Sequence, residues 1–153
     1  NREEIECFGY NSRLDTIQAA IANHVMKGLE TVTSKRIKNA QMYDEGFRDL
    51  HDFVKIPPRK KNVRQVFHTY VVRMKNRERL IEYLKNSGVE TKIHYPIPIH
   101  LQKPCKEYGY KKGSFPVCEA QAKEIISLPV HQYLTKQQIY YVIEVIKRFY
   151  NRA

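Results

Sequence analysis

A run of apolar residues at helical spacing near the N-terminus limits the possible folds of this chain most strongly. Leu14, Ile17, Ile21 and Val25 recur every three or four residues, and the pattern resumes after a soft region from Gly28 to Ser34. Its second half consists of Ala40, Tyr43, Phe47 and Leu50. The pattern predicts two consecutive helices or one long kinked helix. Amphipathic patterns much longer than about 25 residues typically cross a subunit or domain boundary.

The residues just before this pattern predict a capped helix start. Ser12 and Asp15 have the spacing of a capping box, so we expect the helix to begin there. Asn11 and Arg13 would present an amide and a guanidinium at the positive end of the helix, which suits a phosphate group. A plain helix cap is the alternative interpretation.

The middle of the chain predicts a β-α-β unit. β-Branched and aromatic residues predominate in 66–74 and indicate a strand, and Asn76 and Gly88 are placed to begin and end a helix. The alternating residues of 89–95 predict a second strand. The two prolines of 94–100 should keep that stretch extended.

Two helices are predicted in the C-terminal third. Pro116 opens the first, and Leu128-Pro129 closes it or forms a short strand. Thr135 and Gln138 form a second capping box before a strongly amphipathic stretch.

The expected fold class is α/β, with an α+β small domain. A length of 153 residues is typical of one hydrophobic core. We expect a long helical arm in 1–55, which crosses a subunit or domain boundary. Residues 56–153 should form a small domain in which a β-α-β sheet layer is followed by C-terminal helices.

The charge of the chain points to anionic partners without choosing among them. Lys and Arg number 27 against 16 for Asp and Glu, a net charge of +11. Polyanions and the phosphates of a small ligand are both compatible with it. The basic stretch 59–64, followed by Phe67 and Tyr70, fits a nucleic-acid surface or a solvated loop before a half-buried strand.

Several classes of protein and site are excluded by composition. The three cysteines form no Cys-x-x-Cys pair and the six histidines are scattered, so we expect neither a disulfide framework nor a metal site. No apolar run reaches the roughly 18 residues of a membrane span, and the charged N-terminus is unlike a secretory signal. We therefore expect a cytoplasmic location. No complete catalytic set is visible from the residues alone.

Four segments in a fixed order carry a family pattern across nearly the whole chain. They are Gly9–Ala20, Phe67–Arg73, Gly88–His100 and Ser127–His131. Together they resemble the C-terminal half of the DegT-type sugar aminotransferases, which use pyridoxal phosphate (PLP) and have the aspartate aminotransferase fold of fold type I.

The resemblance implies an enzyme that, at full length, moves an amino group, usually from glutamate, to the keto group of a nucleotide-linked sugar. It implies PLP as cofactor and active sites at a homodimer interface. It also implies that the arm, 1–55, joins the large domain and contributes to that interface. The Schiff-base lysine would belong to a large domain before Asn1, and no lysine here stands in the family's Schiff-base motif. The resemblance therefore implies that this chain alone is inactive and holds no catalytic residue.

The family's Gly-x-Asn-x-Arg motif maps onto Gly9, Asn11 and Arg13. The resemblance implies that Asn11 binds the PLP phosphate of the partner subunit and that Arg13 lies beside the cofactor and binds substrate. Position 12, commonly aromatic in the family, is Ser here.

The family's His-Tyr-Pro motif maps onto His94, Tyr95 and Pro96. The resemblance implies that His94 and Tyr95 lie near the substrate entrance and bind substrate. A purely structural role at the end of a strand is the alternative.

Two rival functions fit the same sequence. A PLP-dependent sugar-nucleotide dehydratase of the same family lacks the catalytic lysine, whose position lies outside this chain. A basic nucleic-acid-binding or regulatory module belongs to another class. Its binding should weaken steeply with salt and need no cofactor. We expect the aminotransferase, with a nucleotide sugar, an amino donor and a second subunit as partners, and with neither membrane nor nucleic acid.

Overall fold

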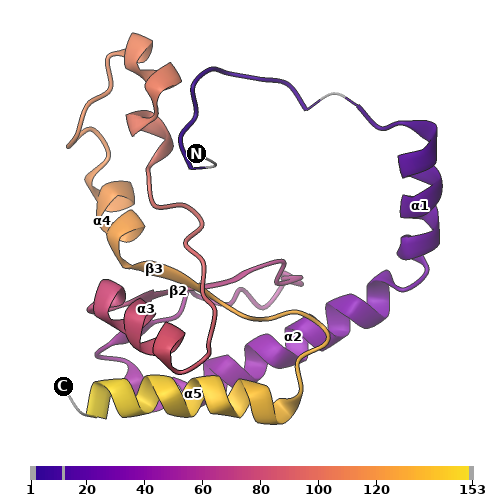
Figure 1. Ribbon diagram of the computed structural model, residues 1–153, viewed down its shortest axis with the longest axis vertical. Helices are drawn as coiled ribbons and strands as arrows, with labels where there is room; N and C mark the ends of the chain where they lie inside the picture. The colour runs from indigo at the N-terminus through magenta and orange to yellow at the C-terminus, as the bar shows by residue number, and fades with distance from the viewer. Residues whose placement is uncertain (1–2, 12, 152–153) are drawn as a thin grey trace.

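A three-stranded antiparallel sheet lies on a layer of helices, and one further helix projects away from both (Figure 1). The computed structural model describes residues 3–11 and 13–151. In chain order the elements are α1 (Thr16–Met26), α2 (Leu29–Gly46), η1 (Arg48–Leu50), β1 (Val54–Lys55), β2 (Tyr70–Met74), α3 (Arg77–Asn86), η2 (Ile99–Leu101), η3 (Lys103–Tyr108), α4 (Pro116–Glu124), β3 (Ile125–Leu128) and α5 (Lys136–Asn151). The elements labelled η are 3-10 helices.

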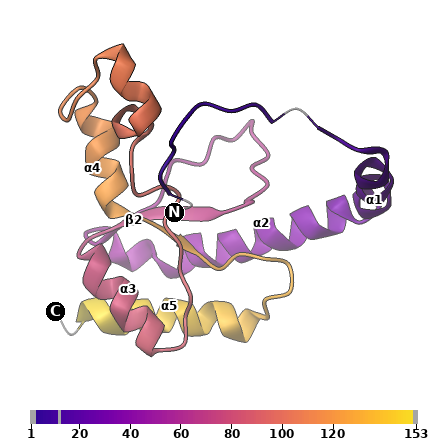
Figure 2. The ribbon, with the colours of Figure 1, turned by 45° about the horizontal axis from the view of Figure 1, so that its top comes forward.

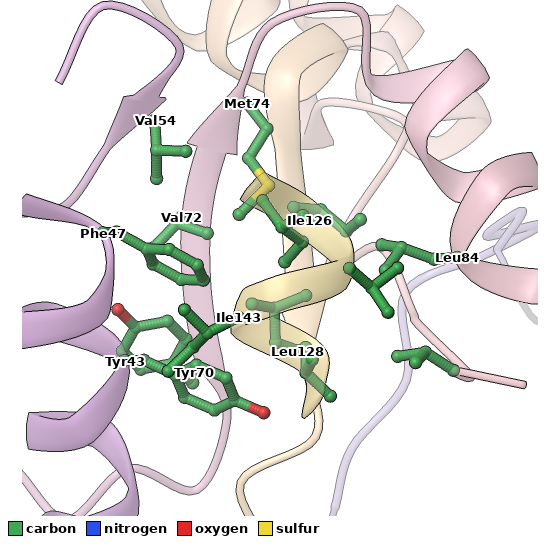
Figure 3. Packing of buried hydrophobic residues seen from close by; sticks show 14 of the residues in the cluster. Tyr43, Phe47, Val54, Tyr70, Val72, Met74, Leu84, Ile126, Leu128 and Ile143 are labelled. Carbon is green, nitrogen blue, oxygen red and sulfur yellow. The ribbon is translucent and has the colours of Figure 1, made fainter. Parts of the chain in front are cut away.

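One face of the sheet forms a wall of the core. The strand order is β1-β2-β3, and the register pairs Tyr70 with Leu128 and Val72 with Ile126. Side chains on alternate residues of a strand point to the same face, so these four lie together, and all four are buried (Figure 3).

The opposite wall of the core comes from α2 and α5, which run side by side beneath the sheet (Figure 2). Tyr43 of α2, Phe47 directly after that helix and Ile143 of α5 are at most 2% exposed. Burying each such side chain stabilises the fold by about 1.5–3 kcal/mol. A Cβ added to Gly46 would lie 2.6 Å from Ile143 Cδ1, so the two helices approach closely at a glycine.

Several predicted element ends are confirmed. Gln138 N donates to Thr135 Oγ1 at 3.2 Å, and Thr135 N donates to Gln138 Oε1 at 2.9 Å, which is the expected capping box of α5. Pro116 is the first residue of α4. Gly88, with a φ of 75°, follows the end of α3 in the expected left-handed conformation.

The N-terminal pattern forms two helices, and the first begins later than predicted. Asp15 is the N-cap of α1, and its N–H donates to Gln18 Oε1 at 3.1 Å. Ser12, the predicted cap, lies outside the described residues. The helical conformation is interrupted at Lys27 and Gly28, and α2 begins at Leu29.

The predicted β-α-β sheet is wrong in detail. The strand expected over 66–74 begins only at Tyr70, because Phe67 has a φ of 50° and interrupts the extended backbone. The strand expected over 89–95 is reduced to one antiparallel bridge between Lys92 and Ser127. The short strand β1 was not predicted.

The connection through α3 nevertheless resembles a split β-α-β unit. Residues 89–95 and β2 both run antiparallel to β3, so they run parallel to each other with β3 between them. The stretch 94–100 is irregular as far as Pro98, but η2 then begins at Ile99, so it is not extended to its end. Across the described residues, no helix combines the length and apolar character that crossing a bilayer requires.

Candidate functional site

A cleft of about 860 Å³ opens between three parts of the small sheet layer. Its walls are the stretch 88–94, the end of β3 with the loop that follows it, and the first half of α5. It is large enough for a small ligand. His94 is the one sequence-predicted site residue that lines it.

The His94 ring is fixed by a buried serine of the sheet. Its Nδ1 lies 2.8 Å from Ser127 Oγ, within hydrogen-bond distance, and Ser127 is 6% exposed. The backbone bridge between Lys92 and Ser127 brings the two segments together. Because Nδ1 is occupied, Nε2 is the ring nitrogen left for a ligand in the cleft. No sequence signal singled out Ser127, although it lies in a segment that carries the family pattern.

Tyr95 follows across a cis peptide bond and is largely exposed. Its ring meets the His94 ring edge-on, with centroids 5.5 Å apart, but Tyr95 does not line the cleft. The structure thus brings the two predicted residues into contact with each other and only His94 to the cavity.

Arg36 of α2 also lines the cleft. Its Nη1 donates to the carbonyl oxygens of Phe67 at 3.2 Å and His68 at 2.9 Å, and its Nε donates to Gln132 Oε1 at 3.3 Å. Bulky residues rarely adopt the left-handed conformation of Phe67, so these bonds help to hold it. No sequence signal singled out Arg36, because its partners are backbone atoms of a distant loop.

Asn11 and Arg13 lie away from the cleft, on the exposed segment before α1. Neither side chain has a hydrogen-bond partner within residues 3–11 and 13–151. The structure therefore does not bring them together with His94 and Tyr95 in one subunit. An amide and a guanidinium held in solvent fit the phosphate of a cofactor, because both donate hydrogen bonds and one is cationic.

The apolar face of α1 is exposed beside them. Exposure is 72% for Ile17, 59% for Ile21 and 63% for Val25. All of α1 stands apart from the sheet and its helices (Figure 1). The predicted stripe is therefore present, and nothing in the described part of the chain covers it.

Both arginines of the basic stretch 59–64 are paired with carboxylates, whereas Lys60 and Lys61 are exposed. Arg59 binds Asp44 through two hydrogen bonds of 2.9 Å, and Arg64 binds Glu30 through bonds of 2.9 and 2.5 Å. Both arginines are paired with carboxylates of α2, which argues against phosphate contacts there. The other basic residues are scattered. Across the described ranges no group of three His, Cys, Asp or Glu side chains could hold a metal ion.

Comparisons with known proteins agree with the motif pattern. The model of the DegT/DnrJ/EryC1/StrS aminotransferase family matches residues 1–147. A protein of Geobacillus stearothermophilus named "Pleiotropic regulatory protein" is 39% identical, over 93% of this chain and 38% of its own length. The dTDP-3-amino-3,6-dideoxy-alpha-D-galactopyranose transaminase of Aneurinibacillus thermoaerophilus is 35% identical, over 92% of this chain and 38% of the enzyme.

The fold also resembles part of a solved structure. The crystal structure of S. venezuelae DesV superposes with a TM-score of 0.87 and 30% identity, over 97% of this chain and 40% of DesV. The chain spans about two fifths of the length of the proteins it matches. From its motifs, its fold and these similarities, the chain belongs to the DegT/DnrJ/EryC1/StrS aminotransferase family, whose members depend on PLP.

Proposed function

We propose that this chain is the C-terminal part of a PLP-dependent aminotransferase that transfers an amino group, from glutamate, to the keto group of a nucleotide-linked sugar. Family membership supports the reaction class. The Aneurinibacillus relative is named a transaminase of a dTDP-linked amino sugar, which supports the substrate class. PLP, when bound, supplies the electron sink for the amino-group transfer.

The observation that carries this proposal is the exposed pair Asn11 and Arg13 next to the exposed apolar face of α1. Donors without partners beside an uncovered apolar face suit a segment that docks on another subunit. We assign Asn11 to the PLP phosphate of the partner subunit in a homodimer. Arg13 lies on the substrate side of the same site and binds the anionic nucleotide sugar.

The arm and the small domain have different roles in this proposal. The arm, 1–55, reaches the partner and joins the large domain, although its residues Tyr43 and Phe47 also pack into the core. The small domain, 56–153, supplies the substrate entrance. There His94 binds substrate through Nε2, with its ring held by Ser127, and the exposed ring of Tyr95 contacts the substrate from outside the cleft.

The covalent anchor of PLP comes from elsewhere in the full-length protein. No lysine of this chain stands in the family's Schiff-base motif. The residue at the Schiff-base position also distinguishes the aminotransferase, which has a lysine there, from the dehydratase, which does not. No contact within the described residues favours the dehydratase, and the paired arginines of the basic stretch argue against nucleic acid.

The test uses the full-length protein with PLP, glutamate and a panel of keto nucleotide sugars. We expect release of 2-oxoglutarate, loss of it with Arg13→Ala at low substrate concentration, and no release from residues 1–153 alone. A full-length protein that eliminates water from the sugar without consuming glutamate would instead be a dehydratase. Binding to nucleic acid that falls steeply with salt would support the rival class.

A further inference from the structure

The N-terminal segment before Asn11 is attached to one small part of the molecule. Figure 1 shows residues 3–11 running from beside η3 across to α1. The attachment involves Gln102 and η3, which lie roughly a hundred residues later in the chain. Gln102 lies outside the four segments that carry the family resemblance.

Gln102 pairs with this segment as a strand residue would. Ile5 N donates to Gln102 Oε1 at 3.0 Å, and Gln102 Nε2 donates to the Glu3 carbonyl oxygen at 2.9 Å. A residue in a parallel ladder likewise uses one acceptor and one donor to bind backbone groups two residues apart. Among side chains, only a carboxamide carries both functions at this spacing.

The Gln102 side chain is committed to this task. The residue is 6% exposed, and its own backbone groups are used locally, since Gln102 N donates to Ile99 O and Cys105 N donates to Gln102 O. The side chain is therefore not needed to hold η2 or η3 together. Glu3 and Ile5 are exposed, so water can satisfy their backbone groups if the carboxamide is lost.

Two further contacts continue the attachment toward Asn11. Lys103 forms an ion pair with Glu6, and the rings of Phe8 and Tyr108 lie with centroids 6.1 Å apart. Between Phe8 and α1, no described residue makes a hydrogen bond, ion pair or ring contact with the small domain, and Tyr10 is 99% exposed. The position of Asn11 is thus set by an anchor that ends three residues before it.

We propose that Gln102 is a positioning residue that holds the segment carrying Asn11 and Arg13 in the conformation in which it reaches the neighbouring active site. The inference rests on the proposed role of Asn11 in the function above. Ordering an unanchored segment costs conformational free energy at the moment of binding. The two hydrogen bonds of Gln102 order the segment before PLP binds, so the segment is preorganised and less free energy is lost on binding.

The test compares Gln102→Met, which keeps the size and removes both hydrogen bonds, with Gln102→Glu, which keeps only the acceptor for Ile5 N–H. The control is Lys106→Met, an exposed residue of the same 3-10 helix. Hydrogen exchange of the Ile5 amide in the full-length protein without PLP should accelerate in Gln102→Met. It should accelerate less in Gln102→Glu, which keeps the acceptor for Ile5 N–H but sets a carboxylate oxygen against the Glu3 carbonyl oxygen, and it should be unchanged in the control.

PLP affinity, measured by its absorbance on the dialysed protein, gives the functional readout. We expect Gln102→Met to weaken PLP binding by about five- to tenfold and to leave the urea midpoint of the core unchanged. In the Asn11→Ala background the same substitution should have no further effect, because the segment would then hold nothing at the phosphate.

The outcomes separate this inference from the proposed function. If Asn11→Ala alone leaves PLP affinity intact, the assignment of Asn11 is wrong. If Asn11→Ala weakens PLP binding but Gln102→Met does not, or if the two effects simply add, Gln102 is only a structural residue.

Discussion

The Asp44 carboxylate holds the Arg59 guanidinium through two parallel hydrogen bonds, each 2.9 Å long. The pair joins α2 to the loop before β2. Tyr70 donates its hydroxyl to the same carboxylate at 2.7 Å. Burial and the neighbouring carboxylate raise the pKa of Tyr70 above its ordinary value, so the hydroxyl stays a donor.

Asp44→Ala should destabilise the protein by about 1.5–3 kcal/mol, because Arg59 and the buried Tyr70 hydroxyl lose their shared acceptor. Urea unfolding measures the change. Tyr70→Phe, which removes one neutral partner and leaves the ion pair, should cost about 1 kcal/mol. Equal losses for the two variants would mean that the ion pair contributes nothing.

Gly46→Ala should destabilise the fold although alanine favours helices. The new Cβ would lie 2.6 Å from Ile143 Cδ1 and 2.9 Å from its Cγ2. Overpacking costs about 1–3 kcal/mol, which exceeds the gain of up to about 1 kcal/mol in helix propensity. Adding Ile143→Val removes Cδ1 and should recover part of the loss. A stabilised single variant would show that α2 and α5 can separate freely.

Stability should fall in acid through Glu119. Burial alone would raise its pKa, but hydrogen bonds from His100 Nε2 and from the amides of Gly113 and Phe115 outweigh it and lower the pKa below 4.5. A carboxyl with a lowered folded-state pKa contributes stability above its unfolded pKa and loses it as pH falls through the folded value.

Glu119→Gln should therefore unfold at lower urea near neutral pH and show a shallower loss of stability below about pH 4.5. Urea midpoints recorded across this range provide the measurement. Glu107→Gln, at an exposed position on η3, is the matched control and should follow the wild-type curve. If Glu119→Gln loses stability below about pH 4.5 as steeply as the wild type, other carboxyl groups cause the acid loss of stability.

Charges on the exposed face of α1 should disrupt the proposed homodimer. Each buried isoleucine contributes about 1.5–3 kcal/mol to association, so Ile17→Glu with Ile21→Glu should raise the dissociation constant at least about a hundredfold. Sedimentation of the full-length protein measures it. Asn23→Glu adds a charge on the same helix outside the stripe and should leave the dimer intact. A wild-type protein that is active as a monomer would contradict the proposal.

A mixed dimer tests whether Asn11 acts across the interface. One subunit carries Asn11→Ala, and the other lacks the Schiff-base lysine. Loss of Asn11 should weaken PLP binding about ten- to a hundredfold at the site to which that asparagine contributes. The single lysine-bearing site then belongs to the Asn11→Ala subunit. Near-normal PLP affinity at that site is expected, because its asparagine comes from the partner. Impaired affinity there would assign Asn11 to its own subunit.

The sequence predicts best the features that depend on neighbouring residues. The capping box of Thr135 and Gln138, the start of α4 at Pro116 and the left-handed Gly88 follow from local backbone chemistry, and all three are confirmed. The apolar stripe of α1 also follows from its spacing.

Features that depend on distant partners escaped prediction. The stretch 89–95 alternates like a strand, but its pairing is limited to the bridge at Lys92, and alternation cannot reveal how much ladder forms. The residue type of Phe67 predicts a strand. Its backbone is left-handed instead, and a hydrogen bond from the Arg36 guanidinium to its carbonyl oxygen helps to hold it there. Gln102 has no local signal, because its partners lie near the N-terminus.

The position of α2 has a mechanical consequence. Its C-terminal half is clamped in the core, while its other end leads to α1, and its 18 residues span about 27 Å. A tilt of roughly 5° at the clamped end would move the far end by about 2 Å over that length. The helix thus acts as a lever. Substitutions at the buried residues Tyr43 or Gly46 would displace α1, although α1 lies far from the atoms that these residues contact.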